Sequence, residues 1–487
     1  MKKDDFYREH PLKILKYSAK NIWLLVFPLL RGIWAMNLNV NQLYMWIKGA
    51  WFDIVVVILI ILFGFAKWWF SKIRFTESAI IHKSGIIVRT KKVIPYENLA
   101  SITREYSYYL RIFKAVRIYV DTCAGVFKSH DMKLIFSRDK CNEFMKQVPQ
   151  QEENSSGDYK YVPSIALIFF FSILFSSSFS GVLYIGAFFI QGGQVAQDVV
   201  HKSIDQITSE VSKFLIVNIP YAVLTVIIIA FGTWFISFIT NMIRYSKFKT
   251  RRCRHNIKVE SGTITPRYFT ICQDKINYYY LKQNLLMKIF RVMSVNVSCP
   301  GYGTSQNKNF PVLLPIETKR RIQGKLRDIA EIEFKYKRQY KPRLDSFWQY
   351  IWLAVYMIVG IYPISLIVPK IAPQFSNVAF FFTIMLEIPA VWYFVIRIAA
   401  LLTSGVTIDD DKIIIWYSKR YAMYTIIAEK SKLVKVDIRQ NWFQILFSHK
   451  CSVGFYFNGE MSERHYVKSL KMKQAQEIKR RLMDKEK

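Results

Sequence analysis

The stretch SGIIVRTKKVIPYENLASITREYSYYLRIF, residues 84–113, decides the fold because the chain repeats it. A second copy, SGTITPRYFTICQDKINYYYLKQNLLMKIF, occupies residues 261–290, and a degenerate third copy occupies residues 418–447. In each copy a turn signal precedes a short apolar run, which a polar break separates from a second apolar run ending in aromatic residues. This pattern is typical of paired β-strands, so the sequence predicts three copies of one all-β module.

Hydrophobic segments precede the three copies in pairs. An apolar stretch of about 20 residues is long enough to span the hydrocarbon layer of a membrane. The middle pair carries no charged residue at all. We therefore expect a multi-pass membrane protein with six spanning helices in three pairs. The six segments are residues 23–30 and 54–66, residues 162–190 and 214–243, and residues 347–368 and 375–402.

A basic amphipathic stretch closes each module, at residues 138–148, 317–333 and 469–487. Apolar residues recur there at helical spacing, as Ile322 and Leu326 illustrate. The predicted unit is therefore a pair of membrane helices, an all-β module and a helix that caps it. The predicted boundaries are a cytoplasmic tail at 1–20, membrane pairs at 21–70, 162–243 and 341–402, modules at 71–148, 244–340 and 403–487, and a linker at 149–161.

Hydrophobic and basic residues occupy different parts of the chain. The 487 residues are 52% hydrophobic, yet they include 69 Lys and Arg against 35 Asp and Glu, for a formal net charge of +34. The N-terminal segment has mixed charge and no small-residue cleavage site, so we expect a retained tail rather than a signal peptide. Because most of the positive charge falls in the tail and the modules, the positive-inside rule predicts that both termini and all three modules face the cytoplasm.

The first module, RFTESAIIHKSGIIVRTKKVIPYENLASITREYSYYLRIF at residues 74–113, resembles the bacterial pleckstrin-homology-like (PH-like) family of YdbS/YdbT-type membrane proteins (DUF304). The triplicated arrangement, which opens with EHPLKIL at residues 9–15, is similar to the longer, YdbT-like members. The resemblance implies seven-stranded sandwiches or partly open barrels, each with a C-terminal helix. It also implies a non-enzymatic role at the cell membrane, with a shorter PH-like companion or self-association, and tolerance of membrane-active peptides as in some relatives.

The sequence offers no motif for catalysis or for metal binding. The GxSxG, HExxH and phosphate-binding-loop patterns are absent. The seven histidines are scattered singly, and none of the six cysteines forms a CxxC pair. We therefore expect no enzyme activity, no metal and no cofactor.

Clusters of basic residues are the candidates for binding. Lys and Arg next to a membrane span attract anionic headgroups. The alternative for the cluster after a span is that its charges only fix the orientation of the helix. The alternative for the basic residues of the first module is an ordinary solvated surface. Nucleic acid could use the same charge, but a module tethered to the bilayer meets phospholipid first, so we expect lipid and no nucleic acid. The candidates are Lys249, Arg251, Arg252 and Arg254 directly after a span, and Arg89, Lys91 and Lys92 in a strand connection of the first module.

Three charged residues interrupt or flank the predicted spans: Arg31, Asp53 and Glu387. A charge that faces lipid is costly, so we expect each of them to face the helix bundle, a water-filled cavity or an interface. Arg31 and Asp53 fall near the outer edge of the membrane, and Glu387 alone falls deep in it.

The sequence therefore predicts a non-enzymatic integral membrane protein. We expect it to protect the membrane against antimicrobial peptides, as in bacteriocin resistance or immunity, by binding lipid or a partner at the inner leaflet. The alternative is a transporter or lipid-moving protein that works through the transmembrane bundle, for which a single deep carboxylate gives little support.

Overall fold

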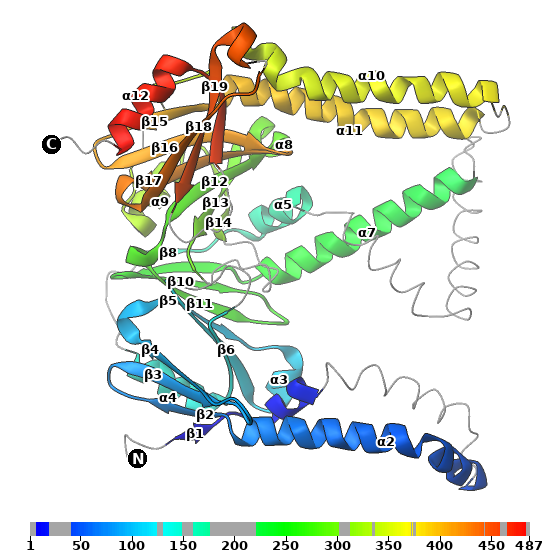
Figure 1. Ribbon diagram of the computed structural model, residues 1–487, viewed down its shortest axis with the longest axis vertical. Helices are drawn as coiled ribbons and strands as arrows, with labels where there is room; N and C mark the ends of the chain where they lie inside the picture. The colour runs from blue at the N-terminus through cyan, green and yellow to red at the C-terminus, as the bar shows by residue number, and fades with distance from the viewer. Residues whose placement is uncertain are drawn as a thin grey trace.

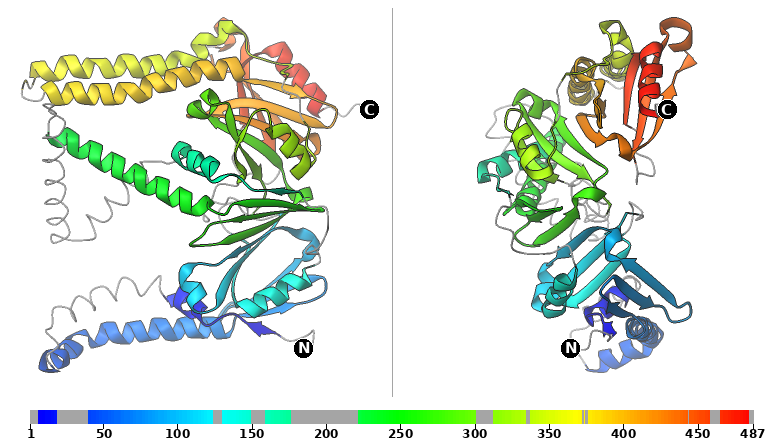
Figure 2. Two further views of the ribbon diagram at one scale, coloured as in Figure 1. Left: turned by 180° about the vertical axis from the view of Figure 1, so that it is seen from behind. Right: turned by 90° about the vertical axis from the view of Figure 1, so that its left-hand side faces the viewer.

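The protein consists of three β modules arranged along its longest axis, with long helices projecting from one side (Figure 1; Figure 2). The computed structural model describes residues 6–18, 40–123, 130–148, 159–175, 221–300, 312–333, 337–371, 373, 376–442, 444–457 and 465–483.

Module 1 has six strands with a short helix after the fourth and a longer closing helix after the sixth. The strand order along the chain follows the predicted pattern, with the Ser-Gly turn between β3 and β4. The elements are β2 (Lys72–Phe75), β3 (Ala79–Ser84), β4 (Thr90–Pro95), β5 (Leu99–Glu105), α3 (Tyr108–Ile112), β6 (Ala115–Thr122), β7 (Met132–Ser137) and α4 (Arg138–Gln147).

Modules 2 and 3 repeat this order of elements, so the predicted repeat is confirmed. Module 2 comprises β9 (Lys249–Cys253), β10 (Asn256–Ser261), β11 (Arg267–Cys272), β12 (Tyr278–Asn284), α8 (Leu285–Ile289), β13 (Val292–Ser298), β14 (Val312–Thr318) and α9 (Ile322–Ala330). Module 3 comprises β15 (Gly405–Ile408), β16 (Lys412–Lys419), β17 (Ala422–Glu429), β18 (Leu433–Arg439), η7 (Gln444–Ser448), β19 (Lys450–Phe457), β20 (His465–Lys471) and α12 (Met472–Met483).

A seventh strand reaches the first two modules from the chain ahead of their membrane helices. Strand β1 (Tyr7–Arg8) pairs with β2, and β8 (Lys160–Tyr161) pairs with β9. In module 3 an isolated bridge between Tyr340 and Val406 takes the same place. The segments predicted as a tail and a linker therefore contribute to the sheets, and modules 1 and 2 reach the expected seven strands.

The turn between the second and third repeated strands differs in module 3. Gly85 and Gly262 have φ of 110° and 92°, and a Cβ at either would meet the carbonyl oxygen three residues ahead at 1.9 or 2.7 Å. Only glycine fits such a turn without strain. Module 3 has no glycine here and forms a tighter turn over Arg420 and Tyr421, with Arg420 at φ 54°.

The three modules are not separate bodies, because they share β-sheets. Strand β5 of module 1 pairs with β11 of module 2, which joins β7-β6-β5 to β11-β10-β9-β8 in one seven-stranded sheet. Strand β12 of module 2 pairs with β17 of module 3 in a six-stranded sheet of order β14-β13-β12-β17-β16-β15. The sequence reading treated the modules as independent, and this joining was not predicted.

Two described helices are long and apolar enough to cross a membrane. The candidate spans are Lys48–Trp69, within α2, and Leu344–Val368, which covers a short turn and most of α10. Only 6% and 12% of the most apolar 18-residue window of each span is buried. Apolar surface that the protein leaves uncovered favours a lipid environment. The long or apolar helices are α2 (Val40–Trp69), α5 (Ile165–Phe175), α7 (Tyr221–Tyr245), α10 (Phe347–Ile371) and α11 (Ser376–Thr403).

Some predicted boundaries move in the structure. The expected span at residues 23–30 lies outside the described residues. Helix α2 begins at Val40, ahead of the second expected span at residues 54–66. The closing helix expected at 317–333 starts only at Ile322, because the apolar run before it continues strand β14 to Thr318.

A buried carboxylate fixes the N-terminal segment to module 1. Glu9 is 2% exposed and forms an ion pair with Lys13. The hydroxyl of Ser71 donates to Glu9 Oε1 at 2.9 Å, and the amide of Ile135 donates to Oε2 at 3.1 Å. Trp68 Nε1 also donates to the Glu9 carbonyl at 2.9 Å. Glu9 thus ties the segment before the first membrane pair to the end of α2 and to β7.

We expect Glu9→Gln to destabilise module 1 by about 3 kcal/mol, because it leaves the buried Lys13 ammonium without its counter-charge. Thermal unfolding of the detergent-solubilised protein measures this as a lower Tm. Glu97→Gln, at an exposed position of the same module, is the control and should leave the Tm within about a degree. Equal melting of Glu9→Gln and the parent protein would contradict this role.

Candidate lipid-headgroup site

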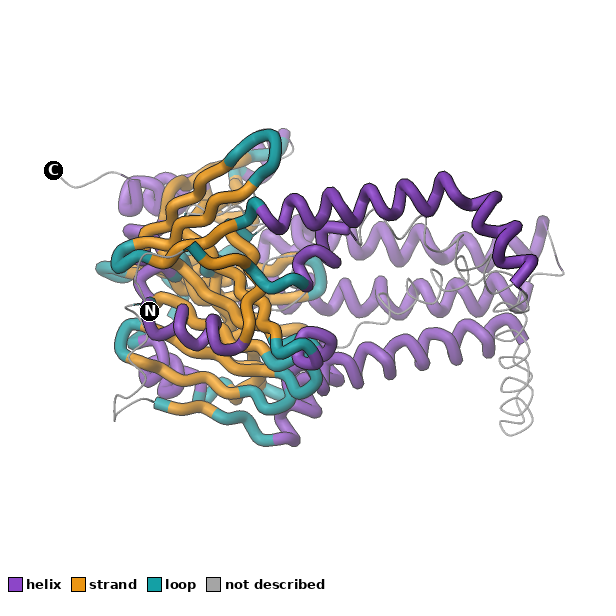
Figure 3. The backbone as a smooth tube through the Cα atoms, turned by 90° about the horizontal axis from the view of Figure 1, so that it is seen from below, coloured by secondary structure: helices purple, strands orange, loops and turns teal. Residues whose placement is uncertain are grey.

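One side of the modules faces the long helices, and contacts between the strands and these helices show which turns lie there. Helix α7 leads into β9, and the β10–β11 turn comes back to it, where Gly262 N donates to Ser246 O at 2.9 Å. The N-cap of α8 contacts α5, because Asn284 Nδ2 donates to Leu174 O at 3.1 Å. We call this side the proximal end of the modules (Figure 3). The closing helix α12 lies at the opposite, distal end (Figure 1).

Exposed apolar side chains gather at the proximal end of every module, on α3, on α8 and on the segment around η7. Tyr108, Ile289 and Trp442 are 67%, 63% and 73% exposed. Aromatic and aliphatic side chains at the foot of membrane helices suit the headgroup–acyl boundary. We call them the proximal tips. They are Tyr108, Tyr109, Ile112 and Phe113 in module 1, Leu286, Ile289 and Phe290 in module 2, and Trp442, Ile445 and Leu446 in module 3.

A basic pocket of about 380 Å³ opens between modules 2 and 3 at this end. Four cations line it, and no Asp or Glu does. We call it the junction pocket. Its basic side chains are Lys288, Arg291, Lys319 and Arg338.

Four separate segments build the junction pocket. Lys288 belongs to α8 and Arg291 follows it, while Lys319 follows β14. Arg338 is fixed at the end of α11, since its guanidinium donates to Leu402 O at 2.6 Å and to Ser404 O at 3.1 Å. The opposite wall is apolar and aromatic, with Trp416, Met423 and Tyr424 from β16 and β17.

The electrostatics of the junction pocket favour an anion. Burial lowers the pKa of Lys288, and the neighbouring Arg338 and Lys319 lower it further. A cluster of like charges in a partly desolvated site is unfavourable until an anion enters it. A phosphodiester offers acceptor oxygens for such Lys and Arg donors.

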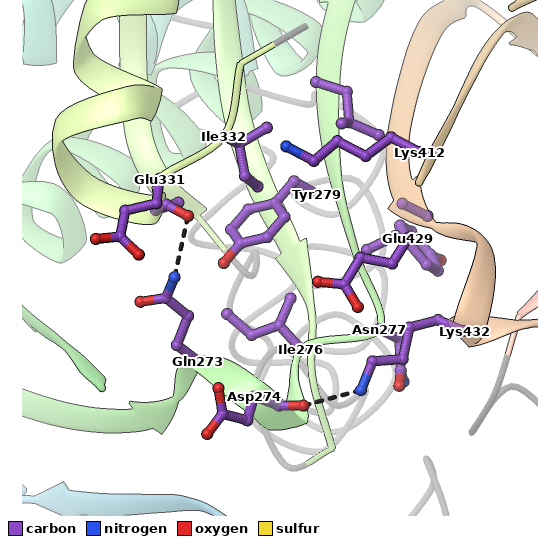
Figure 4. Close-up of a pocket in the computed structure, with 14 residues that line it drawn as sticks. Gln273, Asp274, Ile276, Asn277, Tyr279, Glu331, Ile332, Lys412, Glu429 and Lys432 are labelled. Carbon is purple, nitrogen blue, oxygen red and sulfur yellow. Dashed lines mark hydrogen bonds between the residues drawn. The ribbon is translucent and has the colours of Figure 1, made fainter. Parts of the chain in front are cut away.

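A second pocket, of about 360 Å³, lies between the same modules but is less suited to an anion (Figure 4). Its lysines, Lys412 and Lys432, are matched by three carboxylates from Asp274, Glu331 and Glu429. Lys432 Nζ donates to the backbone oxygen of Asp274 at 2.9 Å. Its walls include η2 (Gln273–Lys275) and the end of α9, away from the proximal end.

The first junction has basic residues at equivalent positions but also an acid. Alignment of the repeats places Arg111 and Lys114 where module 2 has Lys288 and Arg291. However, the first junction contains the buried Glu105, whose carboxylate lies 3.3 Å from Arg117 and 3.5 Å from Arg267. The second junction is therefore the stronger anion site.

The structure places the predicted cluster after the second pair along β9, which runs away from the proximal end. Lys249 begins this strand, and Arg254 lies in the turn after it, at φ 49°. Arg251 lies 4.0 Å from Glu260, and Arg252 pairs with Glu331 near the end of α9. None of the four lines the junction pocket.

The predicted group in module 1 is divided between two places. Arg89 lies in the exposed β3–β4 turn beside Ile87 and Val88, which are 90% and 75% exposed, at the proximal end. Lys91 and Lys92 lie on β4, an edge strand.

The charged residues of the predicted spans do not come together. Asp53 is half-buried in α2 and Glu387 is half-buried in α11. These helices belong to opposite ends of the molecule (Figure 1), and Arg31 lies outside the described residues. Among the described residues no group of three or more His, Cys, Asp or Glu could hold a metal ion.

The residues of the junction pocket were missed in the sequence. Lys288 and Arg291 lie in and directly after the repeated motif that ends in Phe290, but Lys319 and Arg338 are far from it along the chain. The pairing of β13 with β14 brings Lys319 beside Arg291, and the pairing of β12 with β17 brings these cations of module 2 to Arg338 at the end of α11.

Comparison with known proteins gives one family and one curated relative. A family model described as the bacterial PH domain matches residues 28–148 and 211–339. The chain is 20% identical over 292 residues to the UPF0699 transmembrane protein YdbT of Bacillus subtilis strain 168. That alignment covers 56% of this chain and 59% of YdbT, less than two thirds of the relative's length. No solved structure matches the chain.

We expect the proximal tips to enter the lipid interface. A solvent-sensitive fluorophore on Ile112→Cys, Ile289→Cys or Ile445→Cys, with Cys123 and Cys253 replaced by serine, should emit at shorter wavelength in nanodiscs and resist an aqueous quencher. Gln476→Cys on the exposed face of distal α12 is the matched control and should be quenched fully. Equal quenching at all four positions would contradict the assignment of the proximal end.

Proposed function

Because the chain belongs to the bacterial PH domain family, we propose that it is a non-catalytic membrane protein whose modules hold anionic phospholipid headgroups at the inner leaflet. The observation that carries this proposal is the junction pocket, in which four cations and no carboxylate meet at the foot of α11.

The position of the pocket supports a lipid rather than a soluble anion. Lys288 and the exposed Ile289 are adjacent in α8, so the basic pocket and an apolar tip share one helix. A headgroup in the pocket would leave its acyl chains beside the tips and α11. Basic residues near a membrane surface attract anionic lipid by about 1 kcal/mol each.

We extend the proposal to the topology of the whole chain. Six spans in three pairs would carry the modules, with the modules and both termini in the cytoplasm. Two apolar helices and the similarity to a transmembrane protein support a membrane location. The distribution of Lys and Arg supports the orientation.

Protection against membrane-active peptides is the physiological role that we propose for this binding. Modules that hold anionic headgroups would reduce the negative charge available to cationic peptides at the membrane. The idea of this role comes from the sequence resemblance, which implies tolerance of membrane-active peptides in some relatives. A transport path through the bundle has less support, because Asp53 and Glu387 lie on helices at opposite ends of the molecule.

The double substitution Lys288→Gln with Arg291→Gln should weaken binding of phosphatidylglycerol about tenfold to thirtyfold, since it removes two of the four cations. Native mass spectrometry of the purified protein, titrated with phosphatidylglycerol against phosphatidylcholine, measures the affinity. Lys412→Gln with Lys432→Gln removes the same charge from the other pocket and is the matched control. Equal affinity in both double variants would overturn the assignment.

Cells that express the protein should survive cationic pore-forming peptides at concentrations several-fold above those that kill cells without it, at equal growth. The Lys288→Gln and Arg291→Gln variant should lose most of this protection at normal expression. Full protection by that variant would show that survival in the presence of the peptides does not depend on the junction pocket.

A further inference from the structure

The two junctions inside the chain are built from equivalent strands. Aligning Gly85 with Gly262, and Phe290 with Phe447, makes β4, β11 and β17 the third repeated strand of each module. The same alignment makes β5, β12 and β18 the fourth. Each junction pairs the fourth strand of one module with the third strand of the next.

The two junctions also share one register. In the first, Ile102 lies opposite Thr270; in the second, Tyr279 lies opposite Ile427. Ile102 and Tyr279 are equivalent positions of the repeat, as are Thr270 and Ile427. The same pairing has therefore formed twice, and it leads from module to module in one direction.

This pairing leaves one strand of each kind open at the two ends of the chain. Among the described residues, β4 is the last strand of its sheet and β18 the first of its sheet. Val93 on β4 is 49% exposed, whereas its equivalents Thr270 and Ile427 are 6% and 1% exposed in the junctions.

The open fourth strand shows the same contrast. Val434 on β18 is 62% exposed, whereas its equivalents Ala100 and Asn277 are 1% and 8% exposed. Both open edges thus carry an apolar side chain where the paired strands are covered. Such edges bind a further strand readily.

We propose that a second copy of this chain continues the series, with β18 of one copy pairing with β4 of the next. The register of the internal junctions would place Val436 opposite Val93 and Asp437 opposite Lys92. Opposite charges at directly facing positions favour this pairing. The proposal rests on the sheet topology alone and does not depend on lipid binding.

Charge at one position of this register also suits the partner. Two adjacent lysines, Lys91 and Lys92, on β4 would repel another β4 edge or a basic strand, a device that edge strands commonly use. On β18, Asp437 accepts from Arg439 Nε at 2.7 Å, and a carboxylate has room for a further donor. Strand β18 also carries Lys435 and Arg439, so the charge complementarity with β4 rests on the single pair of Asp437 and Lys92.

The geometry of the chain suits assembly in one membrane. The internal junctions keep the long helices of all three modules on the same side of the β-sheets (Figures 1 and 3). A third junction of the same kind would keep the helices of the next copy on that side. Contacts of this heterologous type form rings when they close and open chains when they do not.

Cysteine cross-linking in membranes tests this pairing directly. Full-length chains with Lys92→Cys and with Asp437→Cys, in a background with Cys123 and Cys253 replaced by serine, are co-expressed with different tags and oxidised. We expect a disulfide-linked dimer of the two tagged chains, at least several-fold above either chain expressed alone. Lys91→Cys with Asp437→Cys is the matched control, because Lys91 points to the opposite face of β4.

A dimer of equal yield in the control pair, linkage of either chain to a different polypeptide, or no linkage would overturn the proposal. Exchanging the two charges provides a second, independent test that needs no disulfide. Lys92→Asp or Asp437→Lys alone should lower the oligomer fraction in mass photometry by up to about fivefold. The chain with both substitutions should recover it, and failure of that recovery would also count against the pairing.

Discussion

The joining of the three modules depends on the need to satisfy open strand edges. Each module divides into two groups of three repeated strands, so each group would expose backbone donors and acceptors on a free edge. The chain meets this need by pairing β5 with β11 and β12 with β17. Modules that look independent in sequence thereby become parts of shared sheets, with their long helices on one side (Figure 1).

The candidate binding site follows from the same pairing. Strand β12 brings α8 against module 3, and β17 brings Met423 and Tyr424 to the other wall. Arg338 donates to the carbonyls of Leu402 and Ser404 and completes the pocket at the end of the long apolar helix α11. If the proposed lipid binds here, headgroup binding would be coupled to the relative position of two modules, and loss of the junction would remove the site.

Much of the fold could be predicted from the sequence, because the repeat fixes the order of strands and helices. The Ser-Gly turns, the closing helices and the uncovered apolar helices α2 and α10 all have local signals. Strand pairing between modules does not, since nothing in the residues of β5 says whether its partner is β4 or β11. Arg251 and Arg252 could be noticed in the sequence because they are adjacent. Lys319 and Arg338 could not, since Lys319 joins the pocket through the pairing of β13 with β14 and Arg338 through the pairing of modules 2 and 3.

The most direct test of the account is a map of lipid contacts on the intact protein. A phosphatidylglycerol with a photoreactive group near its headgroup, incorporated in nanodiscs with the full chain, is activated and the adducts are located by mass spectrometry. The account predicts adducts concentrated in residues 285–293 and 416–425, which form the two walls of the junction pocket. Adducts confined to the distal end, on α9, α12 or the β9–β10 turn, would contradict it.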